Sequence, residues 1–326
     1  MSQEFTNWQR ILFLFFLKDL TGFSGGLGTS FGSVLINSLI IPSAAALGGL
    51  SKSKKNAVVV SRKIIVRDGL WLLLVEFVLI YFIQQGVISW VESLVLIILY
   101  GLYVLYLFKT MKGGHDINYE EPFSDKDKVS FLSAFIILDL KRMIIGNQKL
   151  NTRTAWVVFV VSSLIIGFVC YFLVLACEWL GSETYSVYGF GELQGLGIPL
   201  LFVAIVFAAI GSSFPDTIIS YKDAQKGNYD DAISNAYGSN IFNLCVALGV
   251  PLFFFTFLYG PIELTQEIVS LITSLSLWFF GLTAFSIFLY TRLGGVTRSQ
   301  ALILIASYVT FILFIFWKAY NVSGGF

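Results

Sequence analysis

The residues with the clearest chemical potential lie in "AAIGSSFPDTIIS", an otherwise apolar run at 208–220. Asp216 is the carboxylate of this run, and Ser212 and Ser213 place two hydroxyls about one helical turn before it. An ionised side chain inside a membrane span is costly and by default marks a functional site. Oxygens of carboxylates, hydroxyls and carbonyls are the ligands that hard cations prefer. The run therefore predicts a cation site centred on Asp216.

Two further residues of this run weaken a regular helix. Pro215 deletes one backbone hydrogen bond, and Gly211 lets a neighbouring backbone approach closely. Freed carbonyls, such as that of Ala209, can then turn toward a ligand, as they do in the broken helices of transporters. We therefore count the Ala209 carbonyl among the candidate ligands and assign Gly211 and Pro215 a structural role.

A second polar cluster, "YGSNIFN", follows the hydrophilic turn "YKDAQKGNYDD". Ser239 and Asn243 are four residues apart and share one helix face, with Gly238 just before them. The two clusters therefore predict a helical hairpin with facing polar surfaces. Small hydroxyl residues in membrane helices also serve close packing, and that alternative fits Ser212 or Ser239 taken alone. Asp216 favours the cation site, because packing needs no carboxylate there.

The chain as a whole is far more apolar than a soluble protein. Its 326 residues are 56% hydrophobic and 13% charged, and the mean hydropathy is +0.80. About a quarter of the residues of soluble proteins are charged. Stretches of about 20 residues with few charges predict membrane spans. We place them at 28–50, 69–85, 91–108, 154–180, 193–220, 231–259, 268–290 and 300–317. The fold class is therefore an all-α, multi-pass membrane protein of the plasma membrane or an organelle membrane.

The basic residues fit an alternating arrangement of these spans. Eighteen of the 21 Lys and Arg lie in loops on one side of the membrane, and the opposite loops contain none. The positive-inside rule assigns the basic side to the cytoplasm or its organellar equivalent. The largest loop, 109–153, contains an amphipathic stretch and is either a tether between two bundles or a regulatory segment.

Other chemistries find little support. Cys170, Cys177 and Cys245 lie inside apolar spans, where we interpret them as small packing residues. The single histidine, His115, has no partner at metal-ligand spacing. We expect no enzyme, because no nucleophile–base pair or metal cluster is recognisable, and no cofactor besides transported ions. We expect no nucleic-acid partner, since the basic residues lie in short loops beside spans.

The stretch 208–243 resembles the second α-repeat of the cation/calcium exchanger superfamily, G-[TS]-S-x-P-[DE] followed by G-S-N-x-x-[ND]. The first glycines of these two motifs, Gly211 and Gly238, are 27 residues apart. The stretches 67–82 and 90–108, and the last helix from 294, resemble the sodium/calcium and potassium-dependent branches. The resemblance covers roughly 25–110 and 154–320. It implies two inverted halves around a central cation site, where sodium is exchanged for calcium by alternating access.

The resemblance implies the ligands by position. In the second repeat these are Ser212, Ser213, Asp216, Ser239, Asn243 and the Ala209 carbonyl. In the first repeat, "GTSFGSVLINSLIIP" places Gly32, Ser33 and Asn37 where Gly238, Ser239 and Asn243 stand, with Val34 in the place of Asn240. Asn243 replaces an aspartate usual in the potassium-dependent branch, which favours potassium-independent transport.

The first repeat departs from the family pattern at its start. "FTNWQR" stands where an acidic motif should begin, and Arg10 takes the place of its carboxylate. We therefore expect an exchanger fold that lacks the first helix and most of the second. The expected divisions are an N-terminal remnant (1–27), a first half with a partial repeat (28–108), a cytoplasmic-side loop (109–153) and a second half (154–320) with a complete repeat at 208–251.

This departure leaves few carboxylates for a divalent ion. Calcium takes about six to eight oxygens, typically including several carboxylates, whereas Asp216 alone suits sodium better. Asp19 has the wrong spacing and adjoins Lys18. Glu76 lies in a span and is either a ligand or a partner for loop bases. A second chain that supplies the missing carboxylate is a further possibility.

Three interpretations follow. The first is an exchanger whose start is missing from this sequence, the second a transport-inactive membrane scaffold or assembly subunit, and the third an exchanger of altered stoichiometry that works as a dimer. The intact second repeat favours the first, and the plausible N-terminus "MSQEFTNWQR" favours the second. We expect a sodium/calcium antiporter with calcium, sodium and the lipid bilayer as partners, and keep the scaffold as the alternative.

Overall fold

The computed structural model describes residues 20–52, 57–110, 140–146, 151–187, 189–292 and 296–322. The elements before the large loop are α2 (Leu20–Leu35), η1 (Ile36–Ile40), α3 (Ile41–Lys52), β1 (Ala57–Val58), α4 (Arg62–Gln84), β2 (Val87–Ile88) and α5 (Trp90–Thr110). Those after it are α7 (Leu140–Ile145), α8 (Thr152–Gly181), β3 (Thr184–Val187), β4 (Gly191–Gln194), α9 (Leu200–Val203), η2 (Ala204–Ala208), α10 (Ala209–Gln225), α11 (Tyr229–Phe242), η3 (Asn243–Ala247), α12 (Gly249–Tyr259), β5 (Ile262–Glu263), α13 (Gln266–Arg292), β6 (Val296–Thr297) and α14 (Arg298–Val322).

Seven continuous helices of the described chain are long and apolar enough to cross a membrane. They run over Phe23–Ser51, Trp90–Thr110, Thr152–Gly181, Leu200–Gln225, Tyr229–Tyr259, Gln266–Arg292 and Arg298–Asn321, and each matches a predicted span. The eighth predicted span, 69–85, corresponds to α4, which has 23 residues but is more charged because it carries Arg67, Asp68 and Glu76.

Two boundaries differ from the prediction. The span predicted from 193 starts only at Leu200, because 191–194 form strand β4 of a hairpin and Pro199 directly precedes the helix. The first helix already includes Leu20, upstream of the start predicted at 28. Of the predicted amphipathic stretch in the large loop, the structure describes α7 alone, and Arg10, Lys18, Asp19 and His115 lie outside the described residues.

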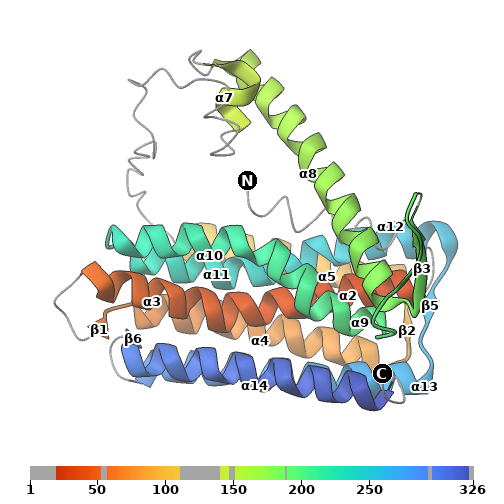
Figure 1. The fold of residues 1–326 in the computed structure, drawn as a ribbon. Coiled ribbons are helices and arrows are strands. Elements are labelled where there is room, and N and C mark those ends of the chain that lie inside the picture. The colour runs from red at the N-terminus through yellow and green to blue at the C-terminus, as the bar shows by residue number, and fades with distance from the viewer. Residues whose placement is uncertain are drawn as a thin grey trace.

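The long helices lie side by side in one bundle, as Figure 1 shows, while α8 runs obliquely away from it toward α7. Short antiparallel strand pairs join the loops at the helix ends. Val58 of β1 pairs with Val296 of β6, and Ile88 of β2 pairs with Ile262 of β5. These pairs tie the loop after α3 to the loop before α14, and the loop after α4 to the loop before α13.

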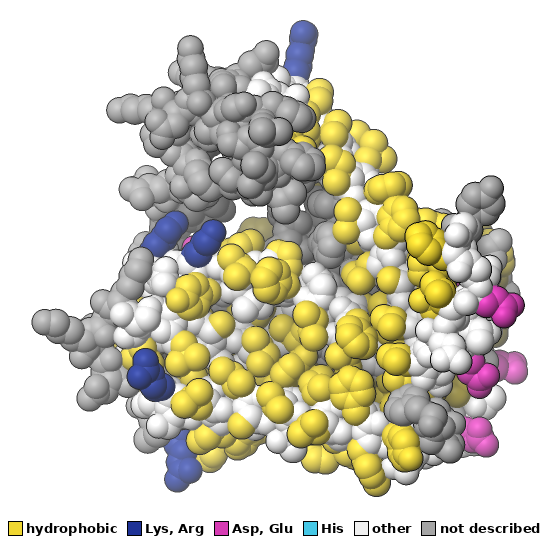
Figure 2. All heavy atoms as spheres, viewed as in Figure 1, with side chains coloured by type: hydrophobic (Ala, Val, Ile, Leu, Met, Phe, Trp, Pro, Cys, Tyr) yellow, Lys and Arg dark blue, Asp and Glu magenta, His cyan; other side chains and the backbone are white. Residues whose placement is uncertain are grey.

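The surface of the bundle is suited to lipid. Large apolar side chains are exposed along the long helices, for example Phe77, Leu164 and Leu313. Figure 2 shows these side chains as a broad band, with Lys and Arg at the end that carries β1 and β6 and Asp and Glu at the end that carries β3 and β5. Exposed apolar area of this extent marks membrane contact, and the charge separation agrees with the predicted loop orientation. The chain is an integral, multi-pass membrane protein.

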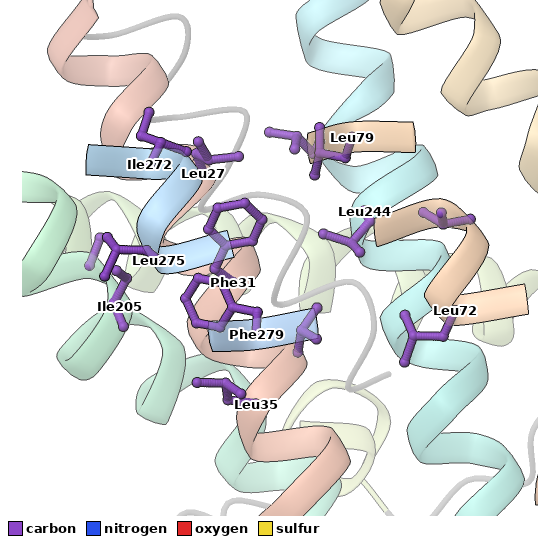
Figure 3. Packing of buried hydrophobic residues seen from close by; sticks show 14 of the residues in the cluster. Leu27, Phe31, Leu35, Leu72, Leu79, Ile205, Leu244, Ile272, Leu275 and Phe279 are labelled. Carbon is purple, nitrogen blue, oxygen red and sulfur yellow. The ribbon is translucent and has the colours of Figure 1, made fainter. Parts of the chain in front are cut away.

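The core draws on both halves of the chain. Phe31 of α2 and Phe279 of α13 pack with their ring centroids 4.5 Å apart, and Figure 3 shows them facing each other between Leu35 and Leu275. Leu72 and Leu79 of α4 and Leu244 of η3 continue the same cluster, which the figure also labels. In lipid such a core is stabilised by van der Waals packing rather than by the exclusion of water.

Glycines bring α2 unusually close to the second half. A Cβ added at Gly32 would lie 2.1 Å from the carbonyl oxygen of Ile205 and 2.4 Å from the Cβ of Ala209. One added at Gly28 would lie 2.6 Å from the carbonyl oxygen of Leu201. The spacing Gly-x-x-x-Gly puts both glycines on one helix face, where small residues let membrane helices approach.

Candidate cation-binding site

Three π-interrupted helices frame the predicted site, and one of them runs in the opposite direction to the other two. The helix α2–η1–α3 runs beside α9–η2–α10, with α2 against α9 and η2 and with α3 against α10. The helix α11–η3–α12 runs the other way, so that α3 contacts α11 and α2 contacts η3. Segment η1 begins one residue before Asn37, and η3 begins at Asn243. Equivalent segments of opposite direction are what an inverted repeat requires.

A serine pair joins the halves at the point where α2 meets α10. The hydroxyls of Ser33 and Ser212 are 2.9 Å apart, although the residues are 179 positions apart in sequence. The Ser212 hydroxyl donates to the Ala209 carbonyl at 2.9 Å, which leaves Ser33 to donate to Ser212. The structure thus brings together the predicted ligands Ser33, Ser212 and Ala209.

The carboxylate lies one turn further along α10. Asp216 and Ser213 are both buried, with 3% and 1% of their surfaces exposed. The helix is not broken at Pro215 but continues through it, and the irregular turn is η2, before Ala209. Proline has no N–H, so the carbonyl of Gly211 loses its helical donor, whereas the Ala209 carbonyl accepts from Ser212. The sequence interpretation named the Ala209 carbonyl as a candidate ligand, but this carbonyl already accepts a hydrogen bond, whereas that of Gly211 has lost its helical donor.

The structure also buries three further predicted ligands, two of which are amides. Asn37, Ser239 and Asn243 are all buried. Neither the amide oxygen nor the amide nitrogen of Asn37 has a hydrogen-bond partner among the described residues. A buried polar group without a partner costs free energy, and a bound cation would satisfy the oxygen.

Asn240 and Ser38 are polar residues that the sequence interpretation did not place in the site. The Asn240 side-chain nitrogen donates to the Val34 carbonyl at 3.1 Å and to the Ser38 hydroxyl at 2.9 Å. Asn240 therefore clamps α11 to α2 and η1. The G-S-N motif alone could have pointed to Asn240, but nothing in the sequence points to Ser38 as its partner.

Replacing Asn240 with alanine should loosen this clamp. We expect a loss of about 1–3 kcal/mol, because two buried hydrogen bonds go and interhelical bonds in membranes contribute about 0.6–1.7 kcal/mol each. The measurement is the thermal midpoint of the detergent-purified protein. Asn235→Ala is the matched control, since Asn235 is exposed on the same helix. Equal midpoints for the two variants would rule out the clamp.

The charge of the cluster is small. Among the described residues, no group of three or more His, Cys, Asp and Glu could hold a metal ion. The predicted ligands in the described chain therefore comprise hydroxyls, amides, a carbonyl and the carboxylate of Asp216. Such a set is rich in neutral oxygen and has one negative charge, which favours a monovalent ion.

Two other buried acids, Asp68 and Glu76, lie on α4. Asp68 pairs with Arg67 at 2.7 Å. Glu76 accepts a hydrogen bond from Thr283 at 2.8 Å, and no Lys or Arg of the described chain pairs with it. Among the described residues, the interpretation of Glu76 as a partner for loop bases finds no support. The sequence interpretation passed over Asp68, although an acid near the end of a span could have drawn attention.

The fold and the buried polar cluster define an integral membrane protein with inverted, π-interrupted helices that meet around candidate cation ligands. A sequence model of the sodium/calcium exchanger protein family matches residues 14–109 and 154–317. The match covers well over half of the chain, which therefore belongs to this family.

Individual relatives match shorter segments. A probable sodium/potassium/calcium exchanger of Drosophila melanogaster is 32% identical over 168 residues, which are 51% of this chain and 24% of that protein. The human sodium/potassium/calcium exchanger 4 is 39% identical over 80 residues, 24% of this chain and 13% of that protein. The chain thus spans about a quarter or less of the length of these relatives.

Solved structures show the same fold. The chain is similar to the H+/Ca2+ exchanger CAX, with a TM-score of 0.64 and 14% identity over 98% of this chain and 74% of that one. It is also similar to the sodium-calcium exchanger NCX_Mj, with a TM-score of 0.54 and 17% identity over 96% of this chain and 84% of that one. At these identities the likeness concerns the fold.

Proposed function

We propose that the chain is a cation antiporter that moves calcium against sodium by alternating access. One observation carries the proposal, namely that Ser33 and Ser212 meet at 2.9 Å from opposite repeats, one turn from the buried Asp216. Packing explains the serines but not a carboxylate in the bilayer. The names of the relatives, which are sodium/potassium/calcium exchangers, support the choice of ions.

Sodium is the ion that this cluster suits best. Asp216 offers one negative charge, which balances one sodium ion, and Ser212, Ser213, Ser239 and Asn37 offer neutral oxygens. Calcium needs a second carboxylate, which we propose to come from a part of the protein outside the described residues or from a second chain. Asn243, an amide in place of an acid, supports transport that needs no potassium. We propose neither an enzymatic step nor a resident cofactor.

The alternative is a transport-inactive scaffold. It is favoured by the scarcity of carboxylates, since the described residues offer no cluster of three metal-ligating side chains. A scaffold would keep the family fold and its docking faces without a working ion cycle. It would therefore tolerate the loss of the Asp216 charge.

Reconstitution into lipid vesicles separates the two proposals. Vesicles loaded with sodium are diluted into sodium-free buffer with radioactive calcium, and uptake is followed with and without external potassium. We expect uptake that needs the sodium gradient and does not need potassium. Choline-loaded vesicles and protein-free vesicles are the controls. Uptake no greater than in protein-free vesicles would favour the scaffold.

A further inference from the structure

The two buried acids of α4 have opposite surroundings. Asp68 receives hydrogen bonds from Arg67 Nε at 2.7 Å and Nη2 at 2.9 Å, from Ser234 at 3.0 Å and from Tyr103 at 3.3 Å. A guanidinium that contacts both carboxylate oxygens supplies the counter-charge that a buried anion needs. Asp68 is therefore held as a structural anion near the basic end of the bundle.

Glu76 has no such counter-charge within the part of the chain that the structure describes. It lies about 12 Å along α4 from Asp68, since eight residues separate them at about 1.5 Å each. The Glu76 side chain is 4% exposed, and its Oε1 accepts from Thr283 at 2.8 Å. The other oxygen, Oε2, has no hydrogen-bond partner among the described residues.

Glu76 also lines a small internal cavity. The other lining residues are Phe31, Val34, Ile80, Leu244, Ser276 and Phe279, three of which Figure 3 labels. Five of these six are apolar, and the Ser276 hydroxyl donates to the Ile272 carbonyl at 2.7 Å. A sodium ion that entered this cavity would lose its coordinating water molecules and find very few protein oxygens to replace them. The cavity therefore does not suit a metal cation.

Among the described residues, the elements around Glu76 carry their positive charges at helix ends and not beside the Glu76 carboxyl group. Helix α13 contributes Thr283 and Ser276 at this level, and its charged residues, Glu267 and Arg292, stand in its first and last turns. From the other elements that contact α4, the titratable side chains are Tyr229, Asp230, Asp231 and Tyr237 of α11, Cys245 of η3, and Glu92, Tyr100, Tyr103, Tyr106 and Lys109 of α5. The one cation among them, Lys109, is exposed in the last turn of α5. The described part of α2 has no titratable group. An isolated ionised carboxylate in such surroundings is far more costly than a neutral acid.

Polar side chains mark a route from Glu76 toward the basic end. Ser286, on the same helix as Thr283, bonds to the Tyr237 hydroxyl at 3.1 Å. One turn before Tyr237 on α11, Ser234 reaches Asp68 at 3.0 Å. Lines of ionisable and hydroxyl groups inside membrane helices are typical of proton pathways.

We propose that Glu76 is a proton-binding site, distinct from the Asp216 cluster, that exchanges its proton with the basic side of the membrane. In this proposal Glu76 is a neutral acid with its proton on Oε2, the oxygen that has no hydrogen-bond partner among the described residues. Release passes this proton to water and leaves a carboxylate. Because that charge needs solvation, release requires α4 to move away from α2 or α13 so that water enters.

Infrared spectroscopy of the reconstituted protein tests the site without any transport assay. At neutral pH we expect the C=O band of a protonated carboxylic acid, which fades as the pH is raised. The band should be lost in Glu76→Gln and kept in Glu192→Gln, because Glu192 is exposed on β4. Asp216→Asn should also keep the band, which would assign it to Glu76 and not to Asp216. A wild-type spectrum without the band, or a band unchanged in Glu76→Gln, would overturn the proposal.

A second variant keeps the test valid if Glu76→Gln does not fold. Thr283→Val has nearly the same shape but removes the hydrogen bond to Oε1, so the band should move to higher frequency. A band at unchanged frequency in Thr283→Val would place the protonated acid elsewhere. The pH dependence of calcium uptake is a separate readout that rests on the proposed antiport. This pH dependence should become flatter in Glu76→Gln. If the infrared band is lost in Glu76→Gln but the pH dependence of uptake is unchanged, Glu76 binds a proton that is not coupled to transport.

Discussion

Asp216→Asn should reduce sodium-driven calcium uptake to the level of protein-free vesicles, a fall of at least about tenfold. The substitution keeps the shape of the side chain and removes its charge, so the site loses the negative charge that offsets a dehydrated cation. A tenfold loss corresponds to about 1.4 kcal/mol, a small part of what an uncompensated charge costs in the bilayer. The initial rate of radioactive calcium uptake is the measurement.

Asp231→Asn is the matched control for this experiment. Asp231 is exposed in the first turn of α11, close in sequence but outside the polar cluster. Its uptake should stay within about twofold of the wild type, since an exposed charge is screened by solvent. Both proteins should elute at the same position in size-exclusion chromatography. Equal uptake by the two variants would exclude Asp216 as the ion ligand and strengthen the scaffold alternative.

Gly32→Ala should cost the protein its folded bundle or much of its stability. The new methyl group would stand 2.1 Å from the Ile205 carbonyl oxygen and 2.4 Å from the Ala209 Cβ. Both obstacles belong to the backbone or are fixed to it, so the whole helix has to shift rather than one rotamer. Overpacking typically costs about 1–3 kcal/mol, and a clash with backbone belongs at or above the upper end. The thermal midpoint and the yield of monodisperse protein measure the effect.

Two other glycines are controls of graded severity. A Cβ at Gly238 would first meet the Tyr103 hydroxyl, at an ordinary contact distance of 3.7 Å. At Gly211 it would meet the flexible end of Leu173 at 3.2 Å. We expect Gly238→Ala to be nearly neutral and Gly211→Ala to be mildly destabilising. If Gly32→Ala is as stable as Gly238→Ala, then α2 and η2 do not pack as closely as the structure has them.

Much of the fold could be predicted because lipid leaves few options. Inside the lipid bilayer no water is present to bond the backbone N–H and C=O groups, so the chain must form these hydrogen bonds internally. Long apolar segments therefore become spanning helices. Seven of the eight predicted spans correspond to helices that are long and apolar enough to cross a membrane. The eighth corresponds to α4, which is long enough but carries more charged residues. The prediction from Gly211 and Pro215 of where the helix is irregular was wrong. Pro215 suggested a broken helix, whereas the irregular turn lies upstream in η2, where the sequence "AIVFA" carries no such signal.

The candidate site was predictable in its residue types but not in its contacts. Asp216 stood out because a carboxylate is rare and costly in a span, and its motif named its neighbours. The pairing of Ser33 with Ser212 depends on how two helices far apart in sequence dock, which the glycine face of α2 decides. The same holds for Asn240 with Ser38, and for the different partners of Asp68 and Glu76.

The sequence by itself determined that this protein lives in a membrane, that helices cross it, and that one carboxylate among hydroxyls is kept within a span. These properties follow from composition and local spacing, which act on each segment separately. The tertiary structure alone decided which buried acid has a counter-charge among the described residues and which does not, and which polar groups of the two halves meet. Such outcomes depend on the three-dimensional surroundings of a side chain, because solvation, charge compensation and packing are set by neighbours that the linear order does not reveal.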